Sequence, residues 1–181
     1  QEDFDLVCPS EYIIERMLKK DLLVPINRNF GKTPDYIPNI SPYIQKELEK
    51  ISQPGRHTND YVVPYMWGTA GILYNKKFKT LEEVSSWGCL WDAVNRGKIL
   101  MKDSYRDAYG TAIIYAHARQ LADSTITVEQ LMNDNSPEAI AFAEQYLKDM
   151  KPNIAGWEAD FGKEMMTKNK AWINFTWSGD A

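Results

Sequence analysis

The sequence predicts a mixed α/β fold with a largely parallel sheet. Short apolar segments of β-forming residues alternate with helical patterns along the 181 residues, which is the order that parallel sheets produce. Hydrophobic residues make up 44% and charged residues 25% of the chain, as in ordinary globular proteins. The sequence contains no repeat, and no apolar run approaches the roughly 20 residues that span a bilayer.

The charge and the cysteine content exclude several classes of protein. The formal net charge is −4, which argues against a nucleic-acid-binding protein and is compatible with a cationic ligand. Cys8 and Cys89 each lie among apolar neighbours, so we expect buried free thiols rather than a disulfide framework. His57 and His117 have no Cys or His nearby and are expected to be structural or surface residues. We therefore expect no metal and no cofactor.

Residues 61–75 form the most β-like stretch of the chain. They are rich in Val, Ile, Tyr and Thr, and we expect two strands, Tyr61–Met66 and Thr69–Asn75, joined through Trp67 and Gly68. The pattern alone leaves two interpretations open. The stretch is either a crossing between two lobes or an ordinary buried hairpin in a single domain.

The part of the chain before this stretch predicts one β-α unit and an irregular segment. Phe4–Cys8 has the composition of a short strand, and Ser10 is placed to cap a helix over Glu11–Lys20. Prolines interrupt residues 22–54, where one helix is expected over Ser41–Ile51. Because an α/β domain rarely begins with a single β-α unit, we expect that upstream sequence is missing.

After the stretch, strands and helices alternate to the end of the chain. Two helix starts are well marked, because Thr127 with Gln130 can form a capping box and Ser136 precedes a proline at the first helical position. The expected elements are helices over 81–86 and 87–95, a strand over 98–101, a helix over 108–121, a short helix from 127, a helix over 136–150, a strand over 153–157, a helix over 161–169 and a strand over 171–176.

Polar and aromatic side chains gather where the predicted strands end, which is where parallel α/β folds bind ligands. Carboxylates form charge-assisted hydrogen bonds with ammonium groups, and aromatic faces attract cations. The set as a whole therefore suits a flexible organic cation, although each acidic residue alone could be a helix cap and each Trp a packing residue. The candidates are Ser10, Tyr12, Trp67, Asp103, Ser104, Asp107, Trp177 and Asp180.

The sequence also resembles a known family. Several of its segments resemble those of the periplasmic polyamine-binding proteins, the spermidine/putrescine substrate-binding components of ABC transporters. These segments occur in the same order as in that family and extend over nearly the whole chain. Trp87–Trp91 matches the family's Ser-Trp-x-x-Leu-Trp signature. The other segments that carry the resemblance are Asp5–Tyr12, Tyr61–Gly71, Leu100–Asp107 and Ile173–Asp180.

The resemblance implies a type II periplasmic binding protein fold, a Venus flytrap in which two α/β lobes close on a polyamine. Residues 1–66 would be a partial first lobe, 67–176 a largely complete second lobe, and 177–181 the start of a returning hinge segment. Parts of the first lobe would then be absent, so the resemblance implies a fragment. For such a fragment we expect weak or absent ligand binding, exposed apolar surface and a non-native dimer formed through it.

Four candidate residues match the family's contact positions. Ser10 and Tyr12 match a Ser-x-Tyr contact to the bound amine. Asp107 stands where the family carries an acidic residue, usually Glu, that pairs with an ammonium group. Trp177 matches an aromatic residue that packs on the methylene chain, and Trp67 would lie in the hinge.

Two positions depart from the spermidine-binding pattern. Ser104 stands where spermidine binders carry Asp, so one acidic contact is lost or moves to Asp103. Asp180 matches the acidic residue of putrescine-type binders, where the spermidine type tends to have Ser. The choice of polyamine therefore stays open, with a slight preference for putrescine.

The implied function is capture of a polyamine and its delivery to the membrane permease of an ABC transporter, with lobe closure as the signal. The protein would work in the periplasm or at the extracellular face of the bacterial cytoplasmic membrane, with any signal or anchor outside this sequence. One alternative is the same fold binding another amine, an amino acid or a sugar. Another is a glycosidase-like enzyme using Asp103 and Asp107. Since the sequence has no Gly-x-Ser-x-Gly elbow or phosphate loop, we expect a binding protein and not an enzyme.

Overall fold

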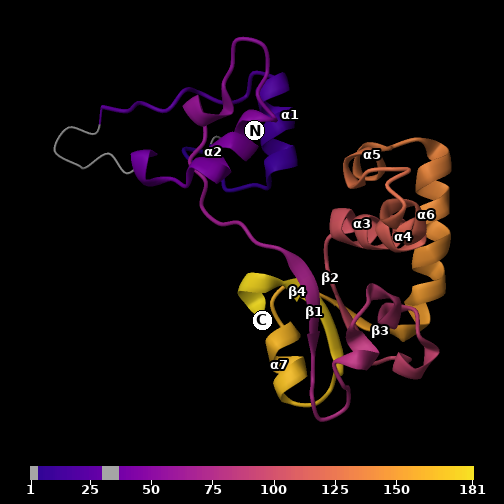
Figure 1. Ribbon diagram of the computed structural model, residues 1–181. Helices are drawn as coiled ribbons and strands as arrows, with labels where there is room; N and C mark the ends of the chain where they lie inside the picture. Colours follow the sequence, from indigo (N-terminus) through magenta and orange to yellow (C-terminus); the bar gives the residue numbers. More distant parts are fainter. Residues whose placement is uncertain (1–3, 30–36) are drawn as a thin grey trace. The chain divides into compact units, whose positions relative to one another are not determined.

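The computed structural model describes residues 4–29 and 37–181, which fall into two compact units (Figure 1). Unit 1 comprises Gln1–Trp67 and unit 2 comprises Gly68–Ala181. Among the described residues, no helix combines the length and the apolar character that crossing a membrane requires. The assignment of lobes to 1–66 and 67–176 stays a prediction.

Unit 1 is built from two helices, α1 (Glu11–Lys19) and α2 (Pro42–Glu49), and from 3-10 turns over Ile37–Asn39 and Thr58–Asp60. Both helices begin where their Ser and Pro residues predict. Neither Ser10 nor Ser41 caps its helix with a side-chain hydrogen bond. Within its described residues, the buried apolar side chains of this unit are Ile14, Leu18 and Ile37.

Two predicted strands of unit 1 are wrong. Phe4–Cys8 and Tyr61–Met66 are not strands, and the described part of this unit, 4–29 and 37–67, contains none. Most of their side chains are exposed, with Leu6 86% and Tyr65 81% exposed. A β-forming segment becomes a strand only when a neighbour accepts its backbone hydrogen bonds, and Pro64 removes one donor from the second segment.

Unit 2 contains a four-stranded sheet in the order β1-β4-β2-β3. The strands are β1 (Ala70–Tyr74), β2 (Ile99–Lys102), β3 (Ile154–Glu158) and β4 (Ile173–Trp177). β1 pairs with β4 in the antiparallel direction, whereas β2 pairs in parallel with both β3 and β4. The sheet is therefore largely parallel, as its alternation with helices predicts.

The helices of unit 2 follow the predicted order. The expected helix over 108–121 begins earlier and is split in two, and the segments 81–86 and 87–95 are short 3-10 turns rather than helices. The capping box at Thr127 forms, and Ser136 accepts a hydrogen bond from the Ala139 N–H. The helices are α3 (Tyr105–Ala116), α4 (Ala118–Ala122), α5 (Val128–Asn133), α6 (Pro137–Met150) and α7 (Gly162–Thr167).

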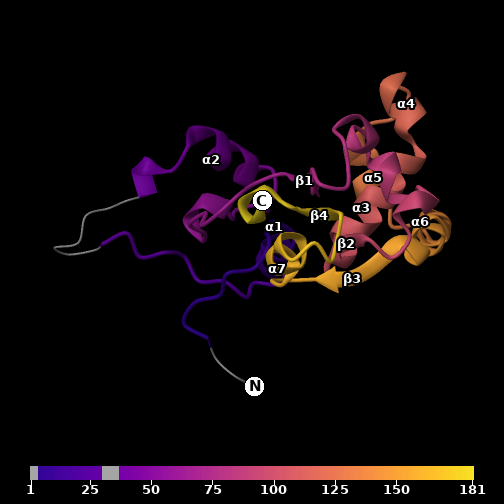
Figure 2. The same cartoon turned by 90° about the horizontal axis from the view of Figure 1, so that it is seen from below.

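Helices cover both faces of this sheet (Figures 1 and 2). Met101 and Phe175 belong to the core cluster that includes residues of α3 and α6. Leu100 instead packs with Met166 of α7. Because side chains alternate along a strand, Lys102 lies on the same face as Leu100, toward α7.

The two cysteines have different surroundings. Cys89 is a buried free thiol, as predicted, and burial raises its pKa to about 11. Cys8 is free but exposed, so the prediction that it is buried is wrong. The cause is the missing strand at 4–8, which leaves Cys8 without a packing partner from a sheet.

Candidate functional site

Three neighbouring parallel strands of unit 2 end at the same edge of the sheet. Their last residues are Lys102 of β2, Glu158 of β3 and Trp177 of β4. The segment after β2 contains Asp103, Ser104 and Asp107, and the segment after β4 contains Asp180. The fold thus gathers the predicted site residues of unit 2 at the carboxyl edge, where such sheets bind ligands.

Lys102 stands at the centre of this edge. Its side chain is only 4% exposed, and its ammonium donates hydrogen bonds to the Ala159 carbonyl oxygen (2.7 Å) and to Oδ2 of Asp180 (3.1 Å). The same ammonium lies 3.8 Å from Oε1 of Glu158. It also lies 4.2 Å from the ring centroid of Trp177, within the range of a cation–π contact.

Glu158 is a buried carboxylate that the surrounding backbone and side chains hold in place. Its Oε2 accepts the N–H of Gly162 at the start of α7 (3.1 Å). Its Oε1 accepts longer hydrogen bonds of 3.5 Å from Asn174 Nδ2 and from Thr176 Oγ1. A buried charge requires such partners, and Lys102 adds the opposite charge.

Asp180 lies in the 3-10 turn Ser178–Asp180 after β4 and pairs with two lysines. Oδ2 accepts from Lys102, and Oδ1 lies 3.2 Å from Nζ of Lys163 on α7. These hydrogen bonds, that from Lys102 first and that from Lys163 second, lower the pKa of Asp180 below its usual value. The carboxylate is therefore ionised and already bound to cations of the chain itself.

Asp107 and Trp177 form the second pair at this edge. The indole Nε1 of Trp177 donates to Oδ2 of Asp107 at 3.1 Å, while 48% of the Trp177 side chain remains exposed. Ser104 caps α3, because its Oγ accepts the backbone N–H of Asp107. Asp103 is exposed, and its backbone N–H donates to the Glu158 carbonyl oxygen.

A small polar cavity of about 120 Å³ adjoins the lysine-carboxylate pairs on the α7 side of the sheet. Its wall includes Asn174, whose buried Oδ1 has no hydrogen-bond partner among the described residues. The lining residues are Glu158, Ala159, Asp160, Lys163, Asn174, Thr176 and Asp180.

The three other candidates belong to unit 1. Ser10 is exposed immediately before α1, and Tyr12 is half-buried in its first turn. Trp67 is 68% exposed, and its ring lies 6.0 Å from that of Tyr43 in a tilted arrangement. Their assignment to a ligand site stays a prediction.

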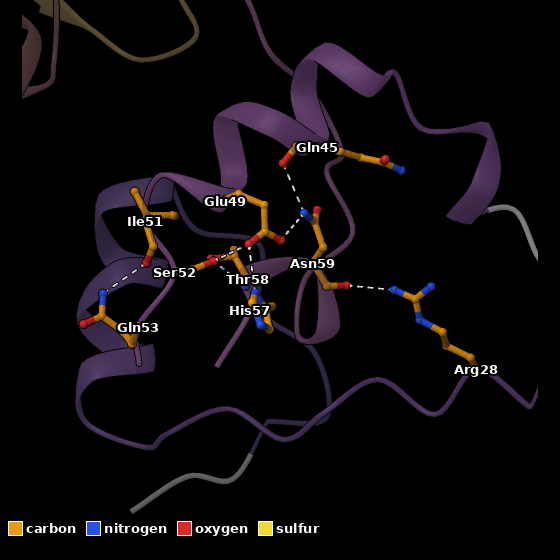
Figure 3. Close-up of polar contacts among 9 residues, drawn as sticks. All are labelled: Arg28, Gln45, Glu49, Ile51, Ser52, Gln53, His57, Thr58 and Asn59. Carbon is orange, nitrogen blue, oxygen red and sulfur yellow. Dashed lines mark hydrogen bonds and ion pairs between the residues drawn. The ribbon is translucent and has the colours of Figure 1, made fainter. Parts of the chain in front are cut away.

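Unit 1 also contains a polar network that the sequence did not indicate (Figure 3). Glu49 of α2 accepts from Ser52 Oγ (2.8 Å) and from Asn59 Nδ2, and it lies 3.3 Å from Nδ1 of His57. Ser52 Oγ in turn accepts the backbone N–H of Thr58. These bonds join α2 to the turn Thr58–Asp60, so the network is structural. It gives His57 the structural role that the sequence analysis expects.

Sequence reasoning missed Lys102, Glu158 and Lys163. Lys102 could have been noticed, because a lysine inside the apolar run Ile99–Met101 needs a buried partner. Its partners come from segments 56 and 78 residues away, and no local pattern indicates those. Among the residues that the structure describes, no group of three or more His, Cys, Asp or Glu side chains is placed to hold a metal ion.

Comparison with known proteins supplies a family. A family model described as bacterial extracellular solute-binding protein matches residues 1–181. The spermidine/putrescine-binding periplasmic protein of Escherichia coli (strain K12) is 27% identical over 178 residues, covering 98% of the chain and 45% of the relative. The putrescine-binding periplasmic protein PotF of the same organism is 25% identical, over 98% of the chain and 46% of the relative.

Solved structures agree with this result. The spermidine/putrescine ABC transporter substrate-binding protein PotD from Streptococcus pneumoniae is 29% identical, with a TM-score of 0.64 over 96% of the chain and 47% of that structure. The TpPotD lipoprotein of Treponema pallidum, 23% identical with a TM-score of 0.63 over 92% of the chain and 46% of that structure, supports the fold alone. The predicted periplasmic binding protein fold is confirmed for the part that the chain spans, which is about half the length of these relatives.

Proposed function

Because this chain belongs to the family of bacterial extracellular solute-binding proteins, we propose that it is part of the substrate-binding component of a polyamine ABC transporter. The component would bind putrescine or spermidine and deliver it to a membrane permease. Relatives named as spermidine/putrescine-binding periplasmic proteins and as an ABC transporter substrate-binding protein support this proposal. The family is described as extracellular and the two Escherichia coli relatives as periplasmic, and we propose the same location for this protein.

The observation that carries the proposal is the pairing of Asp107 with Trp177. The hydrogen bond from the indole N–H fixes the ring of Trp177, which is half exposed. A carboxylate has acceptor capacity beyond one hydrogen bond, so Asp107 can also receive a ligand ammonium. The adjacent ring offers an apolar face to methylene groups and a cation–π contact to the charge.

We also propose that the site binds its ligand without catalysing a reaction. The alternative, a glycosidase-like pair, requires Asp103 and Asp107 to share one substrate as acid and base or nucleophile. In this structure Asp107 is bonded to the Trp177 indole, and Asp103 lies exposed on the loop before α3. The names of the relatives, which are transport proteins, support the same conclusion.

We further propose that the 181-residue chain alone pairs with a second copy of itself. Support comes from the apolar side chains that unit 1 exposes, among them Leu6, Val24 and Tyr65. Exposed apolar side chains of this size are favourable to bury against a partner. Such a dimer would be a property of this chain by itself and not of a transporter.

Calorimetric titration with putrescine, spermidine and spermine tests the ligand. It should be done on this chain and on the longest native form that contains it, where we expect the tighter binding. Hydrogen bonds to charged groups contribute about 1.5–3 kcal/mol, so Asp107→Asn should weaken binding by about 10- to 100-fold. Asp123→Asn is the matched control, because Asp123 is an exposed aspartate that pairs with the exposed Arg119 four residues earlier.

Two results would contradict the proposal. One is a folded protein that takes up no polyamine but binds an amino acid or a sugar. The other is polyamine binding that Asp107→Asn and Asp123→Asn affect equally, because the carboxylate would then have no specific role.

A further inference from the structure

The candidate site already holds a cation of its own. The ammonium of Lys102 contacts the Ala159 carbonyl oxygen, the Asp180 carboxylate and the face of Trp177. A carboxylate, a neutral acceptor and an aromatic face are the contacts that a bound organic ammonium would seek. Lys102 therefore occupies a position that fits one ammonium group of a ligand.

Lys102 is firmly held in this position. Its backbone lies in β2, between β3 and β4, and its side chain is 4% exposed. If the ammonium moved away, the buried Glu158 would lose its nearest opposite charge, and isolating one member of a buried ion pair typically costs about 3–5 kcal/mol. A ligand ammonium would therefore have to overcome both this cost and the repulsion between like charges.

The lysines also reduce the charge that the site offers to a ligand. Glu158 and Asp180 carry two negative charges, and Lys102 and Lys163 carry two positive charges, so these four side chains together are neutral. Of the carboxylates that follow or end the parallel strands, Asp103, Asp107 and Asp160 are outside this neutral group. Because Lys102 and Lys163 cancel the charges of Glu158 and Asp180, the edge can neutralise fewer ligand ammonium groups than its carboxylates alone would.

We propose that Lys102 is a specificity-determining residue, which fills one ammonium position of the site and so selects a short diamine over a longer polyamine with three or more charges. In this arrangement Asp180 holds Lys102 and does not contact the ligand. The inference rests on the proposed function above, and it adds a charge class for the ligand and a residue that imposes it.

Binding of putrescine and spermidine to Lys102→Met tests the proposal. Methionine keeps much of the length of the side chain but removes its charge. We expect the affinity for spermidine to rise about tenfold relative to that for putrescine, because Oδ2 of Asp180 becomes available for one charge-assisted hydrogen bond while Oδ1 keeps its pairing with Lys163. Lys163→Met is the matched control: it also removes a cation from Asp180, but Lys163 is 65% exposed, and the ratio should stay as in the wild type.

Asp180→Asn in the otherwise unchanged protein should, unlike Lys102→Met, have little effect on polyamine binding. If Lys102 engages this carboxylate, polyamine affinity should change by less than about threefold, well under the effect of one charged hydrogen bond. A loss as large as that of Asp107→Asn would overturn the inference while leaving the polyamine function intact. The double variant Lys102→Met/Glu158→Gln provides the same binding test without a lone buried carboxylate, should Lys102→Met fail to fold.

Chemical rescue tests the ammonium position without any polyamine. Lys102→Ala should be stabilised by n-propylammonium chloride, measured as a rise in thermal midpoint beyond that given by potassium chloride at equal ionic strength. Lys163→Ala should show no such rise. A folded Lys102→Ala with no specific rescue would overturn the inference. A third outcome is rescue by the amine although neither this chain nor the longer native form binds any polyamine. The proposed function and the selection of a diamine would then fail, but the ammonium position itself would be supported.

Discussion

Glu49 is the residue on which the polar network of unit 1 depends (Figure 3). The hydrogen bond from Ser52 is the largest influence on its pKa, and further bonds from Asn59 and His57 act in the same direction. Together they hold the pKa of Glu49 below its ordinary value of 4.5. Because Glu49 ends α2 and its partners Asn59 and His57 lie in and beside the turn Thr58–Asp60, the ionised carboxylate stabilises the packing of α2 against that turn.

Acidification should therefore loosen this part of unit 1. A carboxylate with a lowered pKa in the folded protein stabilises it fully above the unfolded pKa, and this contribution is lost as the pH falls through the lowered value. We expect hydrogen-exchange protection of the Thr58 amide, which donates to Ser52 Oγ, to fall below pH 4.5. Glu49→Gln should already lower the protection at neutral pH and flatten this acid dependence.

Glu47→Gln on the same helix is the control. Glu47 pairs with Lys50 one turn away, and the lysine side chain is 62% exposed. Because exposed ion pairs contribute little to stability, Glu47→Gln should leave the protection of the Thr58 amide nearly unchanged. An unchanged acid dependence in Glu49→Gln would show that other groups cause the loss.

At the scale of residues, the sequence indicated where site chemistry would gather but not how it would be paired. Asp107 and Trp177 could be placed at strand ends from the pattern. Their hydrogen bond joins residues 70 positions apart, and it exists because β4 lies beside β2. The pairing of Lys102 with Asp180 depends on the same strand order, so a carboxylate that seemed available for a ligand has a partner from its own chain.

At the scale of elements, local signals were predictable and strand pairing was not. The capping box at Thr127 and the Ser-Pro start of α6 form as predicted, because the interacting groups lie within one turn. Tyr61–Met66 and Ala70–Tyr74 have similar compositions, but only the second is a strand. The difference is that β4 pairs with β1 along its whole length, and no such neighbour exists for the other segment in the described structure.

The start of α7 gives a prediction at this scale. A Cβ added at Gly162 would lie 2.5 Å from Asn174 Nδ2 and 2.7 Å from Cδ of Glu158. Both neighbours are buried, and Glu158 is held by several hydrogen bonds, so they cannot withdraw cheaply. Gly162→Ala should therefore lower the free energy of unfolding by about 1–3 kcal/mol, the usual cost of overpacking, although alanine favours helices.

Gly71→Ala is the matched control for this experiment. Gly71 lies in β1, and an added Cβ there would meet nothing within 4 Å. Replacing a strand glycine removes unfolded-state entropy, so this variant should be neutral or slightly more stable. Chemical denaturation followed by circular dichroism measures both. Equal stabilities for the two variants would mean that Glu158 and Asn174 are not fixed by packing around α7.

At the scale of the whole molecule, the α/β class followed from the alternation of strand and helix patterns. The strand order β1-β4-β2-β3 did not, because it is decided by contacts between segments far apart in the sequence. Nor could the pattern show that unit 1 contains helices and turns but no strand in its described part. The segments predicted as strands, Phe4–Cys8 and Tyr61–Met66, are the ones whose apolar side chains this unit exposes.

The exposed apolar side chains of unit 1 lead to the last prediction. Leu6 is 86%, Val24 83% and Tyr65 81% exposed, and the neighbouring Met66 is 73% exposed. Burying such side chains is favourable by about 25 cal/mol per Å². We therefore expect two copies of the chain to associate and bury them. In sedimentation velocity, the 181-residue chain should shift from monomer toward dimer as its concentration rises.

Substitutions identify the surface involved in this association. Leu6→Ser combined with Tyr65→Ser should move the transition to about tenfold higher concentration or more, which corresponds to a loss of about 1.4 kcal/mol or more. Val94→Ser changes a side chain of unit 2 that is 60% exposed. This variant should leave the concentration of the monomer–dimer transition unaltered. A clean monomer at high concentration would contradict self-association altogether. Equal effects of the unit 1 and unit 2 variants would instead show that the copies associate through non-specific hydrophobic contacts and not through unit 1.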